Sequence, residues 1–317
     1  MTDPNTTPTC PICNHSSQFI YHCSDLFYEV TTYQAPIYRC DHCATLFQHP
    51  VPDRNQIASF YPPGYWQENT KQTLLSRLQR IYIDTMLKFD LMRWVSRLKL
   101  NPKGVFLDIG CSRGDWLDLI RSKGWAVAGV EADPRAAAFA KDRLNLPIEN
   151  VDVESWSPQE GAYKVISFFH LLEHVSSPHD FLAKVRKALV KDGKILLRVP
   201  NAGSAQLRWF GKRWKGLEMP RHIHMFNPYS LKLLLQSQGF EIEASSTWSL
   251  RDGPPALTSS LFPAGEPTRQ EILRQPRPIA TMIYLILNWL MTPLEVLCSL
   301  FGQGAMITVI ARIREPS

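Results

Sequence analysis

The 317-residue sequence has neither a large excess of one charge nor low-complexity segments, since charged residues make up 20% of it and the formal net charge is +6. These absences exclude a chain that stays disordered for lack of apolar residues, and 44% hydrophobic residues can bury a substantial core. The opening residues, MTDPNTTPTCPIC, contain no basic leader followed by an apolar run. We therefore expect no secretory signal and a cytoplasmic protein. The mild basic excess fits an anionic substrate, a membrane surface or nucleic acid, and it selects none of them.

Cysteine is scarce after residue 44, because five of the seven cysteines precede it. In a reducing compartment, paired cysteines are more often metal ligands than disulfides. Two C-x-x-C pairs, Cys10 with Cys13 and Cys40 with Cys43, offer four thiolates to one cation, as a structural zinc requires. The pattern predicts a zinc-ribbon module over residues 1–50.

The role of this module is expected to be structural, because four thiolates leave no open position on zinc for a substrate or water. Other side chains of the module could replace one of the four cysteines as a ligand: Cys23, His15, His22 and His42. A nucleic-acid-binding ribbon is the functional alternative. It would need basic residues interleaved with aromatic ones, yet acidic residues outnumber Arg39 around the second pair.

Residues 51–100 are expected to connect this module to the rest of the chain. The segment 44–67 is rich in proline and aromatic residues, which is typical of an irregular connector on the surface. Residues 73–99 then carry apolar side chains at helical spacing, with basic side chains on the other faces. We predict a helix there whose basic face is solvated.

From residue 105 onward, short apolar runs alternate with helical patterns. The expected strands cover residues 105–110, 126–131, 164–169, 194–200, 240–246 and 306–313. The expected helices cover residues 115–123, 134–144, 179–190 and 228–238. This alternation predicts an α/β fold with a mainly parallel sheet covered by helices on both faces, and a ligand beyond the carboxyl ends of the strands.

The loop after the first of these strands lacks the G-x-G-x-x-G pattern of a dinucleotide site. The stretch VFLDIGCSRGDWL contains Gly110 and Gly114, with Ser112 where the middle glycine would fall. Asp108 precedes the loop and would be poorly placed beside a pyrophosphate but well placed beside a cation. S-adenosylmethionine carries an ammonium, a sulfonium and no phosphate. Glu131, at the end of the second strand, can accept hydrogen bonds from both ribose hydroxyls.

Residues 105–313 resemble a class I S-adenosylmethionine-dependent methyltransferase, through VFLDIGCSRG, GVEAD, FFHLLEHVSSP, VPNAGS and PRHIHMF in that order. Together with CPIC, CDHC and FYPPGYW, the chain resembles bacterial methyltransferases with an N-terminal zinc ribbon, a group that includes deoxysugar and surface-polysaccharide modifiers. The resemblance implies a Rossmann-like seven-stranded sheet in a catalytic domain over residues 101–317. It also implies S-adenosylmethionine as cofactor, held by Asp108, Gly110, Gly114 and Glu131.

Further roles follow from the same resemblance. Asp152, after the third strand that the resemblance implies, is expected to contact the adenine amino group, with a solvated loop acid as the open alternative. Methyl transfer from an activated sulfonium needs only alignment of the acceptor and, where required, removal of its proton. Histidine suits that task near neutral pH. The candidate bases are His222 first, then His170 and His224.

The acceptor is expected to be methylated on oxygen. Sugar C-methyltransferases look similar around HIHMF but use a tyrosine and a glutamate where this chain has Arg221 and Ile223. Deprotonating carbon is harder than deprotonating a hydroxyl, so we expect O-methylation of a sugar, glycan or other small molecule. A nucleic-acid-modifying or nucleic-acid-binding protein is the alternative, and nucleic acid is not the expected partner.

Residues 279–302 form the most apolar segment of the chain. Asn288, Pro293 and Glu295 interrupt it, and the expected final strand must rejoin the sheet, so we predict no membrane span. We predict one or two helices broken near Pro293 that form an insertion in the catalytic domain. Packing on the protein core and peripheral contact with a membrane interface are both left open.

Overall fold

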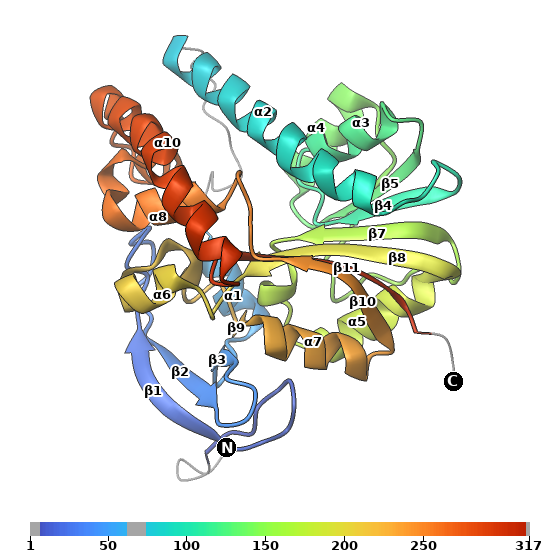
Figure 1. The fold of residues 1–317 in the computed structure, drawn as a ribbon, viewed down its shortest axis with the longest axis horizontal. Helices are drawn as coiled ribbons and strands as arrows, with labels where there is room; N and C mark the ends of the chain where they lie inside the picture. Colours follow the sequence, from blue (N-terminus) through green and yellow to red (C-terminus); the bar gives the residue numbers. More distant parts are fainter. Residues whose placement is uncertain (1–6, 62–73, 315–317) are drawn as a thin grey trace. The chain divides into compact units, whose positions relative to one another are not determined.

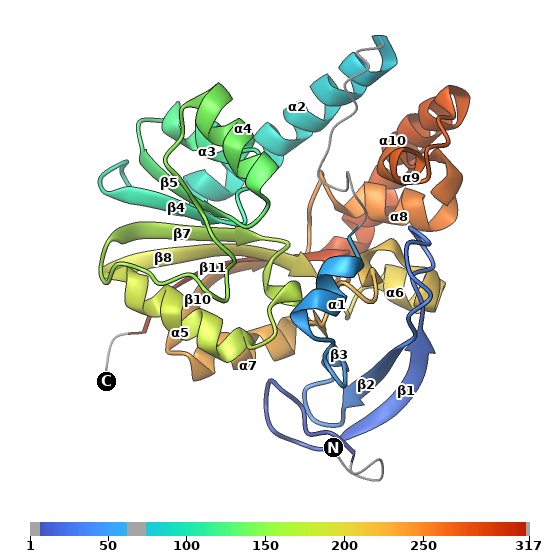
Figure 2. The same cartoon turned by 180° about the vertical axis from the view of Figure 1, so that it is seen from behind.

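The computed structural model describes residues 7–61 and 74–314, and the predicted connector partly lies outside these described residues. Contacts divide the chain into two compact units, each assembled from separate stretches of sequence (Figures 1 and 2). The first unit draws on the ranges 1–87, 200–231 and 246–307, and the second on 88–199, 232–245 and 308–317. The predicted division into 1–50, 51–100 and 101–317 stays a prediction.

The second unit is built around a seven-stranded sheet in the order β10-β11-β8-β7-β4-β5-β6. Its strands are β4 (Val105–Ile109), β5 (Ala126–Glu131), β6 (Ile148–Asn150), β7 (Tyr163–Phe169), β8 (Leu189–Pro200), β10 (Phe240–Ser246) and β11 (Met306–Ile313). Parallel pairing joins β4 to β5 and β7, β5 to β6, and β7 to β8. Strands in such a sheet are buried on both faces, which explains the continuous apolar runs in the sequence.

Helices cover both faces of this sheet, so the predicted Rossmann-like α/β fold is confirmed. Helices α3 (Asp115–Arg121) and α4 (Pro134–Leu144) lie on one face, and α5 (Pro178–Ala188) and α7 (Pro228–Ser237) on the other (Figure 1). The long helix α2 (Leu74–Arg97) precedes the sheet in sequence and corresponds to the helix that apolar spacing predicts over residues 73–99. Local signals set the helix ends. In α4, Asp133 caps the first turn through the amides of Arg135 and Ala136, and Asn145 ends the helix at a φ of 50°.

The first unit contains a four-stranded sheet and a group of helices. The strands run in the order β1-β2-β3-β9, with bounds β1 (Ser17–Cys23), β2 (Ala35–Cys40), β3 (Leu46–Gln48) and β9 (His224–Met225). The helices are α1 (Arg54–Ser59), α6 (Ala205–Phe210), α8 (Gly253–Leu261), α9 (Pro267–Ile272) and α10 (Pro278–Leu300). Short 3-10 turns are η1 (Leu172–His174) in the second unit and η2 (Gly211–Arg213), η3 (Lys215–Leu217) and η4 (Pro263–Gly265) in the first.

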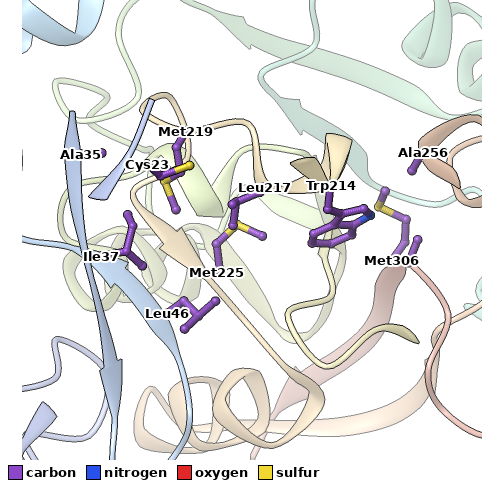
Figure 3. Packing of buried hydrophobic residues seen from close by; sticks show 11 residues of the cluster. Cys23, Ala35, Ile37, Leu46, Trp214, Leu217, Met219, Met225, Ala256 and Met306 are labelled. Atoms are coloured by element: carbon purple, nitrogen blue, oxygen red, sulfur yellow. The ribbon is translucent and has the colours of Figure 1, made fainter. Parts of the chain in front are cut away.

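A hydrophobic cluster holds distant parts of the first unit together (Figure 3). Ile37 and Leu46 of the N-terminal strands contact a cluster that includes Trp214, Met225 and Met306. The N-terminal strands therefore share their core with segments that lie far along the sequence. In addition, β3 pairs with β9, with Leu46 opposite Met225 and Phe47 opposite His224.

Helix α10 corrects one prediction. The sequence predicted a break near Pro293, but a single helix runs through this residue from 278 to 300. Proline removes one backbone hydrogen bond, yet its fixed φ is itself helical. The last turns beyond Pro293 are held by the buried side chains of Glu295 and Cys298, so tertiary contacts offset the lost hydrogen bond.

Candidate functional site

The loop that follows β4 folds back onto the end of β5. The amides of Gly110 and Cys111 both donate to the carbonyl of Val130, at 2.8 and 3.1 Å. This turn requires a φ of 75° at Gly110, a conformation that glycine adopts at low cost. Ser112, at the middle position, also has a positive φ of 49°. The loop therefore forms a tight turn although Ser112, not glycine, occupies its middle position.

Glu131 ends β5 directly beside this loop. Its Oε2 accepts from the amide of Ser112 at 2.7 Å, and its Oε1 accepts from the amide of Asp133 at 2.8 Å. Burial raises the pKa of Glu131, while these backbone hydrogen bonds oppose that rise. A carboxylate offers about four lone-pair sites, so acceptor capacity remains for a hydroxyl of a ligand. The side chain is thus fixed in orientation and still able to accept.

Asp108 lies in β4 and is only 4% exposed. Its Oδ1 accepts from the hydroxyl of Ser167 at 2.5 Å, and the indole of Trp116 donates to the same hydroxyl at 3.3 Å. Burial raises the pKa of Asp108 to about 7, and the charge of Glu131 adds to this effect. Sequence reasoning missed Ser167, whose place opposite Asp108 follows from the register of β4 and β7.

The two remaining predicted cofactor residues have additional local roles. Gly114 is the N-cap of α3 at a φ of 79°, and a Cβ there would lie 2.5 Å from the side chain of Leu146. Packing alone therefore explains this glycine. Asp152 is an exposed residue just beyond β6, and its Oδ1 accepts from the amide of Glu154 at 2.8 Å. Its contact with adenine stays a prediction.

These residues fit S-adenosylmethionine. Asp108 in β4 and Glu131 at the end of β5 lie on neighbouring parallel strands, and burial raises the pKa of each carboxyl group. A cationic ligand would favour the charged form of both groups. The acceptor capacity left on Glu131 suits ribose hydroxyls, and this contact stays a prediction.

His170 follows β7, at the same edge of the sheet as the loop. Its amide donates to the carbonyl of Arg198 at 2.9 Å, and its φ is 52°. The ring Nδ1 lies 3.5 Å from Oε1 of Glu173, whose side chain is fully buried. A buried carboxylate therefore lies beside one ring nitrogen of His170. Sequence reasoning assigned Glu173 no role, although its i,i+3 spacing from His170 was a usable signal.

The other two candidate histidines belong to the first unit. His222 is buried, and its Nδ1 lies 3.1 Å from the carbonyl oxygen of Gly216. His224 is 1% exposed and pairs with Phe47 in the sheet. Both have structural surroundings that account for their burial, and their catalytic roles stay predictions.

The four predicted metal ligands come together. All four Sγ atoms of Cys10, Cys13, Cys40 and Cys43 lie within 4.8 Å of one another. The Cys10–Cys43 and Cys13–Cys40 separations are 3.6 and 3.5 Å. Four ligands at tetrahedral angles around zinc, with Zn–S bonds of about 2.3 Å, would be about 3.8 Å apart. The cluster therefore fits a tetrahedral zinc.

Of the alternative ligands, Cys23 lies away from the four cysteines, whereas His15 and His42 lie beside them. Cys23 belongs to the hydrophobic cluster near Met219 (Figure 3). The rings of His15 and His42 stack on each other at 4.0 Å, and Nδ1 of His15 lies 2.8 Å from the carbonyl oxygen of Cys13. These exposed rings border the cluster and could also contribute nitrogen atoms, because His15 and His42 group with Cys13.

A family model described as "Methyltransferase domain" matches residues 83–245, about half of the chain. This range includes the β4–α3 loop, Glu131 and His170. Among solved structures, the fold is similar to a chain in a complex of the Haloferax volcanii Trm112 methyltransferase activator and a methyltransferase, with a TM-score of 0.52. The match has 11% identity and covers 75% of this chain and 94% of that chain, so it bears on the fold alone.

Curated relatives match shorter stretches. A Schizosaccharomyces pombe protein named ubiquinone biosynthesis O-methyltransferase, mitochondrial, is 30% identical over 129 residues, which cover 38% of this chain and 47% of that protein. The ubiquinone biosynthesis O-methyltransferase of Maricaulis maris is 27% identical over 150 residues, covering 44% of this chain and 59% of that protein. The chain thus spans about half of the length of these relatives.

Proposed function

We propose that this chain, which belongs to the methyltransferase-domain family and is an S-adenosylmethionine-dependent methyltransferase, methylates a hydroxyl oxygen of a small-molecule acceptor. The observation that carries the choice of oxygen is the naming of its curated relatives as O-methyltransferases. Those relatives are named for ubiquinone biosynthesis rather than for sugars. The sugar or glycan acceptor therefore rests only on the resemblance in the sequence.

The residues of the second unit have distinct tasks in this proposal. Glu131 would hold the ribose hydroxyls, and Asp108 would face the positive charge of the cofactor. The cofactor supplies an activated methyl group, so the remaining tasks are to align the acceptor and remove its proton. His170 is the candidate for the second task, because it follows β7 and its Nδ1 lies 3.5 Å from Oε1 of the buried Glu173.

A structural zinc on Cys10, Cys13, Cys40 and Cys43 completes the proposal. The sulfur separations support it, as do the amides that point at the sulfurs. Those of Ile12 and His42 donate to Cys10 and Cys40, each at 3.4 Å. Such donors stabilise thiolates, which are the form that binds metal. This zinc would hold the N-terminal strands and take no part in methyl transfer.

The cofactor site is tested by calorimetry with S-adenosylhomocysteine. Glu131→Ala should weaken binding by roughly 10- to 100-fold, because a hydrogen bond to a charged group contributes about 1.5–3 kcal/mol. Asp142→Ala, in α4 of the same unit, is the control and should bind like wild type. If both variants bind S-adenosylhomocysteine with equal affinity, Glu131 does not contact the cofactor.

The reaction is tested with labelled methyl donor and three acceptors: a phenol, a sugar nucleotide and an RNA oligonucleotide. We expect an O-methyl product from a small molecule and none from RNA. His170→Asn should lower kcat by about 10²- to 10⁴-fold with little change in S-adenosylhomocysteine affinity. His179→Asn, on α5, is the matched control. If His222→Asn or His224→Asn alone abolishes turnover, the base has been assigned to the wrong histidine.

A further inference from the structure

Helix α10 carries its polar and apolar side chains in the reverse of the usual arrangement. Every exposed residue of this helix is apolar, and the face that these residues form is called the α10 face. Its large members include Ile279, Met282, Ile283, Ile286, Leu290 and Leu297. The buried residues of the same helix are Thr281, Tyr284, Asn288, Glu295 and Cys298. By length and composition the helix could cross a membrane, and only 22% of its most apolar window is buried, so it is not a helix of the protein core.

Specific hydrogen bonds fix this orientation of the helix. The carboxylate of Glu295 accepts from Nε2 of Gln206 at 2.7 Å and from the amide of Ala305 at 2.8 Å. The hydroxyl of Tyr284 lies 3.0 Å from that of Ser259 on α8. A rotation that buried the apolar side chains would break these contacts and leave buried polar groups unsatisfied or force them into water. The exposed apolar face is thus a consequence of the internal polar anchors.

These anchors also argue against a membrane crossing. A crossing helix would place the Glu295 carboxyl in hydrocarbon, whereas here it is fully buried among protein donors. Both ends of the helix return to the first unit. The amide of Arg277 donates to Gln270 before the helix, and the amide of Asn201 donates to Ala305 after it.

The exposed charges in the segment that carries α10, residues 273–302, are positive. Within residues 273–302, Glu295 is the single carboxylate and is buried, whereas Arg274 and Arg277 are exposed at the start of the helix. An apolar face flanked by basic residues is typical of helices that lie in the plane of a membrane interface, and each basic residue near anionic lipid adds to the attraction. At about 1.5 Å per residue, the 23-residue helix would lie along about 34 Å of the bilayer surface.

We propose that the α10 face binds the surface of an anionic lipid membrane, with its aliphatic side chains among the acyl chains and Arg274 and Arg277 at the headgroups. A second protein molecule fits less well. Protein interfaces usually carry about one hydrogen bond per 100–200 Å² and a polar rim. The structure describes every residue of α10. Among its exposed side chains, Trp289 alone carries a hydrogen-bonding group, its indole N–H, so the face offers few hydrogen bonds to a protein partner.

Vesicle flotation of the full-length protein tests the proposal. We expect wild type to float with phosphatidylcholine vesicles that contain roughly a third phosphatidylglycerol, and less with phosphatidylcholine alone. Ile283→Glu should lower the bound fraction by about tenfold or more, because it places a charge in the apolar interface. Ile20→Glu on β1 is the matched control, since Ile20 and Ile283 are both 42% exposed. This control should float like wild type.

Two further measurements separate the sources of binding. Arg274→Gln with Arg277→Gln should reduce flotation with anionic vesicles to the level seen with neutral ones. Brominated lipids should quench tryptophan fluorescence, and Trp289→Phe should remove most of that quenching. Thermal unfolding of each variant confirms that it is folded.

Several results would overturn the proposal. Wild type that does not float, or Ile283→Glu that floats like Ile20→Glu, would show that the α10 face does not bind lipid. Sedimentation that detects a dimer dissociated by Ile283→Glu, without vesicle binding, would assign the face to a second copy of the chain. Retention on membranes after high salt and carbonate would indicate a crossing helix. Because α10 lies outside the matched methyltransferase range, none of these outcomes affects the proposed methyl transfer.

Discussion

At the scale of single residues, the two acidic residues of the candidate cofactor site differ in what surrounds them. Glu131 is held by backbone amides, which the sequence could not disclose because they depend on how the loop folds. Asp108 is held by one hydroxyl in an apolar setting. The choice of both carboxylates was predictable from their positions at the ends of neighbouring strands. Their protonation was not, because it depends on burial and on Ser167.

The raised pKa of Asp108 predicts a pH-dependent stability difference between wild type and Asp108→Asn. Because the folded-state pKa, about 7, exceeds the unfolded value, the folded protein binds the extra proton between about pH 4 and 7. The stabilisation by this carboxyl is therefore complete at low pH and is lost as pH rises through 7. Relative to wild type, Asp108→Asn should gain stability from pH 4 to pH 8, by at most about 4 kcal/mol.

This difference is measured by urea unfolding of the ligand-free proteins at several pH values. Glu149→Gln, at an exposed residue of β6, is the control and should show a much smaller pH dependence. A constant difference between Asp108→Asn and wild type at every pH would contradict the raised pKa. The same variant should also bind S-adenosylhomocysteine more weakly than wild type.

At the scale of elements, long periodic segments were predictable and short ones were not. Strands β5, β10 and β11 have the predicted bounds, because each is a run of apolar or alternating residues ended by a turn. Strand β6, with three residues, and β9, with two, carry too little periodicity to be recognised. Strand β9 exists because β3 pairs with it. The predicted break at Pro293 was wrong, because the rule that proline breaks helices does not take account of the tertiary contacts of Glu295 and Cys298.

The two C-x-x-C turns, with their four clustered cysteines, give a prediction at this scale. Cys40→Ser should lower the zinc content of the purified protein from one per chain toward none and destabilise the N-terminal strands, because zinc binding contributes to folding free energy. Metal analysis and thermal unfolding with and without a chelator measure both effects. Cys23→Ser is the control, since Cys23 lies in the hydrophobic cluster, and it should keep its zinc. Wild-type protein purified without zinc would refute the metal assignment.

At the scale of the whole molecule, the chain alternates between its two compact units. The first unit takes its described residues from three ranges separated by parts of the second. A linear reading of the sequence divides the chain into consecutive domains and cannot detect this alternation. The contacts that create it join distant residues, as when the side-chain amide of Asn227 donates to the carbonyl of Cys43 at 2.8 Å. The N-terminal strands therefore depend on residues near 220 for their stability.

The buried ion pair of Asp25 and Arg221 is another of these long-range contacts and gives the last prediction. Arg221 is fully buried, and its guanidinium makes two hydrogen bonds to Asp25, at 3.2 and 2.6 Å, while Nε donates to the carbonyl of Phe60 at 2.9 Å. Arg221→Met should destabilise the first unit by about 3–5 kcal/mol, because it leaves the buried Asp25 carboxylate without its counter-ion.

A double-mutant cycle in urea distinguishes an ion pair from simple packing. Asp25→Leu with Arg221→Met should cost less than the sum of the two single changes, because the double variant leaves no unpaired charge. The unfolding transition of the first unit is identified as the one that Ile37→Val, in its hydrophobic cluster, shifts to lower urea. Additive costs would mean that the two residues act independently. The link between residues 25 and 221 would then not be what holds the N-terminal strands to the rest of the first unit.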